Sequence, residues 1–256
     1  MPFEYIDVET AVQRDGLRMV VVGGVPSPWS EAAKGILHIK GIEWAAVRLA
    51  YDSETLKQWT GELSAPVLMV GQERPRRGWA DILLLAERLV PTPSLLPADP
   101  AERALAFGLA HELCGECGLG WSRRLQLIHA GLHNSGGFPD RVAKYLGKKY
   151  GYSKEAGAAA TERVTTLLGM LSARLKTQRE AGSSYYIGNA VTAVDVYSAS
   201  VVGLFRPLPH DLCPMEASVR TAFETRDSET DAALDPILLE HRDLMYARHL
   251  ALPISL

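Results

Sequence analysis

The turn at residues 23–30, Gly-Gly-Val-Pro-Ser-Pro-Trp-Ser, is the first place in the sequence where chemistry is expected. Residues 18–22 form a compact β-branched run, which is typical of a buried strand. From Ala32 onward, apolar residues recur at spacings of three and four, as on one face of a helix. We therefore expect any active site to be organised around this turn, with Ser27 and Ser30 as its hydroxyl-bearing residues. The two glycines lack the third glycine and acidic partner of a dinucleotide motif, so a nicotinamide site is not expected.

A second candidate is the pair Cys114 and Cys117, which has the spacing C-x-x-C. A redox pair of the thioredoxin type would lie at the start of the first helix of an α/β domain, where residues 26–29 contain no cysteine. A structural zinc site needs a second pair of ligands, and only His111 falls on the same helical face. Two interpretations remain open: a metal or oxidation-sensing site, and a pair of buried structural thiols, which is the simpler of the two.

The elements that must position these residues fall into two parts. Residues 1–16 are predicted to be an N-terminal extension, and residues 17–90 an α/β domain. Strands are expected at 18–22, 42–49, 65–70 and near 73–75. Helices are expected from Ala32 to a stop at Gly41, from a cap at Asp52 or Ser53 to Trp59, and at 79–89. Pro66 cannot donate to a strand ladder, so it must begin a strand or lie at an edge or a special turn.

A proline-rich segment separates this part from an all-helical one. Residues 90–100 contain four prolines, which excludes a regular helix, so 91–100 is predicted to be a linker. Residues 101–256 are then predicted to be all-helical, with helices at 101–115 (continuing toward 133), 139–150, 154–180, 192–205 and 235–250. Thr192 and Asp195 have the spacing of a capping box, in which each side chain accepts a backbone N–H of the other residue. We interpret this box as a folding element without a chemical role.

Composition narrows the function classes. The chain has 256 residues, is 47% hydrophobic and carries a net charge of −3, so no nucleic-acid partner is expected. No run of about 18 apolar residues occurs, so no membrane span is expected either. The three scattered cysteines and the lack of a secretory signal predict a reducing, cytoplasmic setting.

Four segments in this order resemble the glutathione transferase superfamily. Ser27-Pro28-Trp29 resembles the Ser-Pro-Phe of its serine-type members, and 65–68 (Ala-Pro-Val-Leu) is similar to its cis-proline turn. Residues 95–104 are similar to its linker and first long helix, and 186–195 to its capping-box segment. The resemblance covers nearly the whole chain after residue 17. It implies a thioredoxin-like N-terminal domain, an all-α helical-bundle C-terminal domain, and a homodimer.

The resemblance also implies a site. In serine-type members the serine hydroxyl donates a hydrogen bond to the glutathione sulfur and favours its thiolate, which makes Ser27 the expected catalytic residue. A helix N-terminus favours negative charge in the same place. The main chain of Val67, beside Pro66, would pair with the cysteinyl part of glutathione, and Trp29 would adjoin it. An apolar second substrate would lie between the domains, with its expected wall formed by His111, Cys114 and Trp121.

The sequence departs from the family at the far end of the glutathione site. Where members carry a carboxylate and a hydroxyl before the third helix, this chain has Gly78 and Trp79, and Ser64 replaces a lysine or glutamine. Arg76 or Arg77 could instead hold the glutathione carboxylates as a bidentate fork. Two hypotheses follow: a glutathione transferase-like enzyme that uses glutathione as co-substrate, no metal, and a small hydrophobic electrophile, or a non-catalytic ligand-binding or protein-interaction module.

Overall fold

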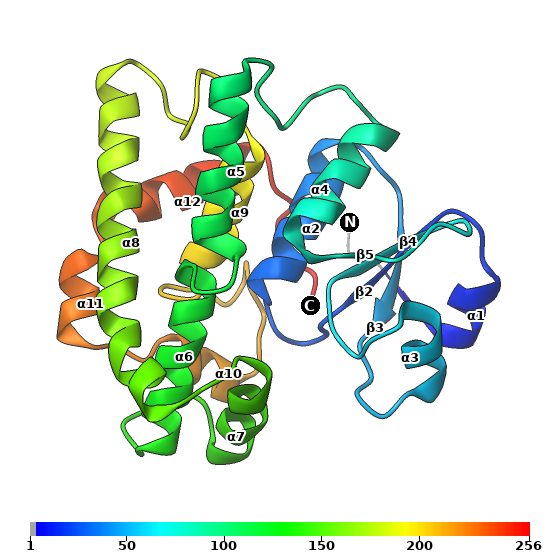
Figure 1. The fold of residues 1–256 in the computed structure, drawn as a ribbon, viewed down its shortest axis with the longest axis horizontal. Helices are drawn as coiled ribbons and strands as arrows, with labels where there is room; N and C mark the ends of the chain where they lie inside the picture. Colours follow the sequence, from blue (N-terminus) through cyan, green and yellow to red (C-terminus); the bar gives the residue numbers. More distant parts are fainter. Residues whose placement is uncertain (1–3) are drawn as a thin grey trace.

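The computed structural model describes residues 4–256 and places a five-stranded sheet beside a bundle of helices (Figure 1). The strand order is β1-β3-β2-β4-β5. Strands β1 and β2 run parallel to β3, whereas β4 is antiparallel to both β2 and β5. The strands are β1 (Tyr5–Ile6), β2 (Leu17–Val21), β3 (Ala45–Arg48), β4 (Val67–Val70) and β5 (Arg76–Arg77).

Both faces of the sheet are covered, which explains why every residue of β2 is buried and why all but Arg18 are apolar. Met19 and Val21 pack on one side with α2 (Pro28–Ile39) and α4 (Gly78–Leu89), and Val20 packs on the other with residues of α1 (Val8–Gln13) and α3 (Glu54–Thr60). Alternate residues of a strand point to opposite faces, so consecutive apolar residues such as Met19 to Val21 are the pattern of a two-sided core. Figure 1 shows α2 and α4 on the side of the sheet that faces the helical bundle.

The N-terminal segment is part of this sheet. Of residues 1–16, predicted as an extension, the described part contains β1 and α1, and β1 pairs Tyr5 with Ala46 and Ile6 with Val47 of β3. Ala11 of α1 is fully buried in the core on that face. The fourth strand also differs from the prediction: β5 lies at Arg76–Arg77, after the residues 73–75 where it was expected.

The second part of the chain is helical, as predicted. Its helices are α5 (Pro100–Cys114), α6 (Leu119–Leu132), α7 (Asp140–Lys149), α8 (Lys154–Glu180), α9 (Ala193–Val202), α10 (Ala217–Phe223), α11 (Ser228–Ala233) and α12 (Pro236–Arg248). The expected continuation from 101 to 133 is broken between α5 and α6. A Cβ on Gly118 would lie 2.7 Å from the carbonyl oxygen of His111, so the chain turns where only glycine fits. The short helices α10 and α11 were not predicted.

The predicted capping box is present at the start of α9 and is the centre of a larger network. The carboxylate of Asp195 is fully buried and accepts the backbone N–H groups of Thr192 at 2.8 Å and Tyr186 at 2.9 Å. It also accepts the hydroxyl of Thr192 at 2.8 Å and Nε2 of His241, on α12, at 2.9 Å. Asp195 therefore joins the start of α9 to the loop before it and to the last helix.

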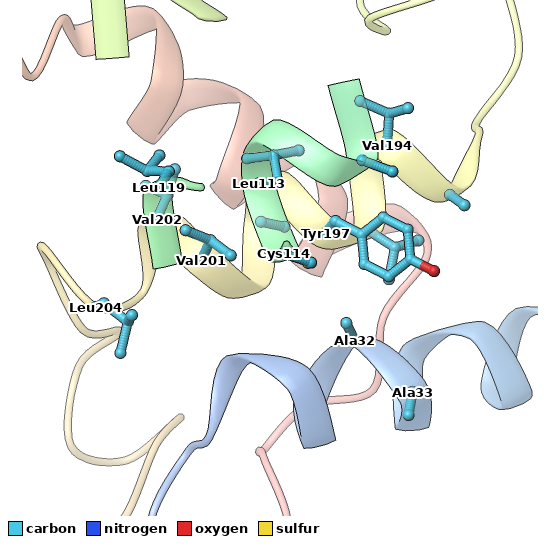
Figure 2. Close-up of a cluster of buried hydrophobic side chains, with 14 of the residues drawn as sticks. Ala32, Ala33, Leu113, Cys114, Leu119, Val194, Tyr197, Val201, Val202 and Leu204 are labelled. Atoms are coloured by element: carbon cyan, nitrogen blue, oxygen red, sulfur yellow. The ribbon is translucent and has the colours of Figure 1, made fainter. Parts of the chain in front are cut away.

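The two parts of the chain meet at α2 and α9. Figure 2 shows the short side chains of Ala32 and Ala33 on α2, and Tyr197 among the labelled residues of α9. Small side chains let two helices approach closely, and a Cβ at Gly35 would lie 3.0 Å from Val196. This apolar contact fixes α2, and therefore the turn that begins it, against the helical part.

Candidate functional site

A cavity of about 670 Å³ opens between the α/β part and the helical part. In the α/β part it is bounded by the turn before α2, the loop before α3 and the loop that leads into β4. In the helical part it is bounded by α6, α7 and α10. Its lining residues are Val22, Val25, Ser27, Trp29, Tyr51, Ala65, Arg124, Phe138, Pro139, Arg141, Val142, Tyr145, Leu146, Lys149, Tyr150, Ser218, Val219, Ala222 and Phe223. The volume is in the range of small-molecule sites, and the wall is largely apolar and aromatic, as in such sites.

Ser27 lines this cavity and directly precedes the helix α2. It is the N-cap of α2, with φ −68° and ψ 120°, yet its side chain makes no capping hydrogen bond. Its main-chain oxygen accepts the N–H of Glu31 at 2.8 Å, so the backbone begins the helix and the hydroxyl is left for another partner. Ser30 is fully buried, its hydroxyl has no hydrogen-bond partner, and it is not among the lining residues.

The predicted proline turn reaches the same cavity as Ser27. The Ala65–Pro66 peptide bond is cis, and Ala65 lines the cavity. Val67 does not: it is fully buried in β4, where it pairs with Val20 on one side and with Arg77 on the other. The main chain at the free end of this strand is therefore that of Ala65, the residue before the proline, and the placement does not support the role predicted for Val67.

The two arginines predicted to bind the glutathione carboxylates make hydrogen bonds to other residues of the protein. Arg76 pairs with Glu73 and donates to the carbonyl of Arg74, and Arg77 donates to the carbonyl of Thr60. These partners hold both guanidinium groups against residues of the α/β part. Neither residue lines the cavity.

Gly78 and Trp79 form the start of α4 and also lie outside the cavity lining. The Trp79 ring packs edge-on against Tyr197, with ring centroids 5.8 Å apart, and its carbonyl accepts the Tyr197 hydroxyl at 3.0 Å. Trp79 therefore joins α4 to α9. No side chain caps α4, so the N–H groups of its first turn remain available to an anion.

The residues expected to form the apolar wall of the second-substrate site do not line the cavity. Cys114 is buried beside Leu113, Leu119 and Tyr197 in the cluster that Figure 2 shows, and burial raises the pKa of its thiol far above the ordinary value. Its carbonyl accepts Nε1–H of Trp29 at 2.8 Å, which orients the indole that lines the cavity. Cys114 ends α5, whereas Cys117 is exposed in the turn that follows, so the two thiols do not share a helical face.

His111 and Trp121 complete that predicted wall, and neither lines the cavity. Trp121 packs edge-on against Tyr150, with ring centroids 4.8 Å apart, and so supports a lining residue from behind. His111 lies against the glycine turn after α5. Within residues 4–256, no group of three or more metal-binding side chains was found.

The sequence interpretation missed the residues that give the cavity its charge and its aromatic wall. They are Tyr51, Arg124, Phe138, Arg141, Tyr145, Lys149, Tyr150 and Phe223. Tyr145 and Lys149 are four residues apart on α7, a spacing that places both on one face of the predicted helix. That face was a signal in the sequence, but nothing in the sequence shows that it turns toward Ser27.

Two contacts join the parts of the chain across the cavity. The Tyr51 and Tyr145 rings meet edge to face with centroids 5.2 Å apart, and Nζ of Lys149 donates to Oγ of Ser64 at 3.2 Å. Burial, with the nearby Tyr145 phenol, raises the pKa of Tyr51 to about 12, so its hydroxyl is a neutral donor at neutral pH. A lysine side chain, that of Lys149, therefore lies beside Ser64, although it belongs to α7 and not to the α/β part.

Comparison with known proteins shows which fold this arrangement of elements has. No family model and no curated protein matches the chain. Among solved structures, a glutathione transferase family member from Pseudomonas fluorescens with two glutathione bound is 14% identical, over 94% of each chain, with a TM-score of 0.61. The chain has the glutathione transferase fold. This confirms the predicted combination of a thioredoxin-like first domain and an all-helical second domain.

Other structures with the glutathione transferase fold agree. A glutathione S-transferase domain-containing protein from Marinobacter aquaeolei is 16% identical over 90% of this chain and 98% of its own, with a TM-score of 0.62. A glutathione S-transferase from Methylobacillus flagellatus with glutathione bound is 11% identical, over 91% of this chain and 95% of its own, with a TM-score of 0.61. No described helix of this glutathione transferase fold is long and apolar enough to cross a membrane.

Proposed function

We propose that this protein is a glutathione-dependent transferase that acts on a small electrophile in the cavity between the domains. The observation that carries the proposal is the position of Ser27. Ser27 lines the cavity at the N-terminus of α2, Ala65 of the cis-proline turn lines the same cavity, and the Ser27 side chain makes no capping hydrogen bond. The Ser27 side chain therefore does not cap the helix, which leaves its hydroxyl to a ligand.

Ser27 would stabilise the anionic form of a thiol. When bound, glutathione would supply that thiol as the nucleophile. The Ser27 hydroxyl would donate a hydrogen bond to the sulfur, and the positive end of α2 would favour its negative charge, so both lower the thiol pKa. The electrophilic carbon of the second substrate then gains a bond to sulfur and loses its leaving group with the bonding electrons, and the thiol proton is released to solvent.

The remaining contacts fit glutathione at two further points. The ammonium of Lys149, held at Ser64, is a cation for a carboxylate close to the cis-proline turn. The uncapped first turn of α4 offers backbone N–H groups to the γ-glutamyl end, in place of the side chains that Gly78 and Trp79 lack. Trp29, oriented by the carbonyl of Cys114, would pack beside the peptide.

The test separates binding from catalysis. With glutathione at about 10 mM, a site at ten times its dissociation constant gains about 1.4 kcal/mol of stability, which a thermal shift detects. S-methyl glutathione, which has no ionisable thiol, is the matched ligand. Retention on glutathione-agarose and turnover of an activated aryl chloride complete the test. If glutathione gives neither a shift nor retention, glutathione dependence is contradicted.

The alternative, a binding module without catalysis, is favoured by one observation. Arg76 pairs with Glu73 and Arg77 donates to the carbonyl of Thr60, so the two arginines expected to bind the glutathione carboxylates already have partners within the protein. The same assay distinguishes the two: a thermal shift without turnover of any electrophile supports the module.

We further propose a homodimer in solution, and light scattering of the eluted protein would show twice the chain mass of 27.9 kDa.

A further inference from the structure

Two consecutive arginines of α6 are equally buried but differ in their partners. Arg123 is 2% exposed and Arg124 is 6% exposed. Arg123 donates to the side chain of Gln126 at 3.1 Å and to the carbonyl oxygens of Leu204, Phe223 and Thr225, the last at 2.6 Å. These acceptors surround its guanidinium, which is why its charge can remain inside the helical domain.

Arg124 has no such set of acceptors. No described carboxylate lies within ion-pair distance of it, and its buried Nε has no hydrogen-bond partner. The Tyr150 hydroxyl is its polar neighbour, and its guanidinium carbon lies 5.3 Å from the Phe138 ring and 5.0 Å from the Phe223 ring. Cation–π contacts offset part of the desolvation of a charge. They leave Nε of Arg124 without an acceptor within the protein, and burial lowers the pKa of Arg124.

The rest of the cavity has the same sign of charge. Arg124, Arg141 and Lys149 all line it, and none of its lining residues is an aspartate or glutamate. The whole chain has more acidic than basic residues, 30 against 27, so this cluster does not follow from composition. A concave site lined by one sign of charge concentrates ligands of the opposite sign.

The wall around Arg124 is aromatic. Tyr150 lies between Trp29 and Trp121, with ring centroids 6.0 and 4.8 Å away, and Phe138 and Phe223 flank the guanidinium. A ligand that satisfies both features has an apolar body and a carboxylate, because a planar carboxylate accepts two parallel hydrogen bonds from a guanidinium.

We propose that the second substrate carries a carboxylate, which Arg124 binds, while its apolar body packs among the aromatic residues and its reacting carbon faces Ser27. This rests on the proposed glutathione-dependent function. Glutathione also has carboxylates, so the shared chemistry is an anion at Arg124 and the experiment must separate the two sources. Lys149, beside the cis-proline turn, is left to glutathione.

The test compares an electrophilic acid with its methyl ester. For the Arg124→Met variant, kcat/KM for the acid should fall at least about tenfold, because a charge-assisted hydrogen bond is lost. The kcat/KM for the ester and the KM for glutathione should both stay within about twofold of the values for the unaltered protein. Arg124→Lys should fall between these, because it keeps the charge and loses the fork. Lys144→Met, which removes an exposed cation of α7 outside the cavity, is the control.

Two further readouts keep the proposal falsifiable. If Arg124→Met raises the KM for glutathione equally with both electrophiles, Arg124 binds glutathione and the proposal is wrong. If Arg124 were only structural, the variant would unfold at lower urea, whereas removal of a buried charge that has no carboxylate partner should leave the midpoint unchanged or higher. Quenching of the protein's tryptophan fluorescence by an aryl carboxylate, and not by its ester, tests the site without glutathione, so its result stands even if no glutathione-dependent turnover exists.

Discussion

Lys149 and Ser64 join the two domains through a hydrogen bond of 3.2 Å between Nζ and Oγ. Ser64 stands two residues before the cis-proline, and Lys149 is the last residue of α7. Burial lowers the pKa of Lys149, partly opposed by the charge of Glu62. The ammonium beside Ser64 is thus supplied by the second domain, so under the proposed function the distance between the domains would affect glutathione binding.

Replacement of Lys149 by methionine should therefore weaken glutathione binding without slowing the chemical step. We expect the KM for glutathione to rise about three- to tenfold and kcat to change by less than about twofold, since a binding contact made equally in ground and transition states affects KM alone. Steady-state kinetics at varied glutathione measures both. Lys148→Met is the control, because Lys148 is exposed and does not line the cavity. An unchanged KM in Lys149→Met would contradict this role.

Replacement of Ser27 by alanine removes the hydrogen bond proposed for the thiolate. A hydrogen bond to a charged group contributes about 1.5–3 kcal/mol, so kcat/KM should fall about 10- to 100-fold. The thiolate is then less stabilised, and the pH at which kcat/KM reaches half its plateau should rise by about one to two units. The pH–rate profile of both proteins measures this shift. Ser30→Ala is the comparison, and an equal loss in that variant would remove the distinction between the two serines.

Replacement of Asp195 by alanine should destabilise the protein strongly without a direct effect on the cavity. It removes the acceptor for Thr192, Tyr186 and His241 in the fully buried start of α9. Loss of one partner of a buried pair costs about 3–5 kcal/mol. Urea unfolding followed by circular dichroism measures the change. Asp140→Ala removes an exposed pair with Lys144 and should change stability by about 0.5 kcal/mol or less.

The thiols should differ in reactivity. The thiol pKa of Cys114 is raised by burial, and that of Cys213 is raised to about 11 by burial and by Glu31, so both remain protonated near neutral pH. Cys117 is exposed. Because the thiolate is the reactive form, iodoacetamide on the folded protein at pH 7 should modify Cys117 and spare the other two. Mass spectrometry of the peptides shows this directly. Rapid modification of Cys114 in the folded protein would contradict its buried placement.

Local patterns in the sequence predicted the elements that depend on neighbours along the chain. Periodicity and capping residues located β2, α4, α8 and the box at Thr192 and Asp195, because these signals act within a few residues. They failed at the break between α5 and α6, where an individual glycine is compatible with a helix. There, close approach of Gly118 to carbonyl oxygens of the preceding turn forces the chain to bend.

The sequence by itself also determined the order of domains and the hydroxyl at the start of α2, since Ser27 is defined by a strand, two glycines and a helix adjacent to it. Only the tertiary structure decided what surrounds that hydroxyl. Arg124 and Lys149 lie on α6 and α7, about a hundred residues away in the sequence, and the packing of α2 on α9 brings them to one cavity. A charge next to its carbonyl acceptors and a charge without them look the same in the sequence, because the difference between Arg123 and Arg124 depends on which atoms the folded chain places around each guanidinium.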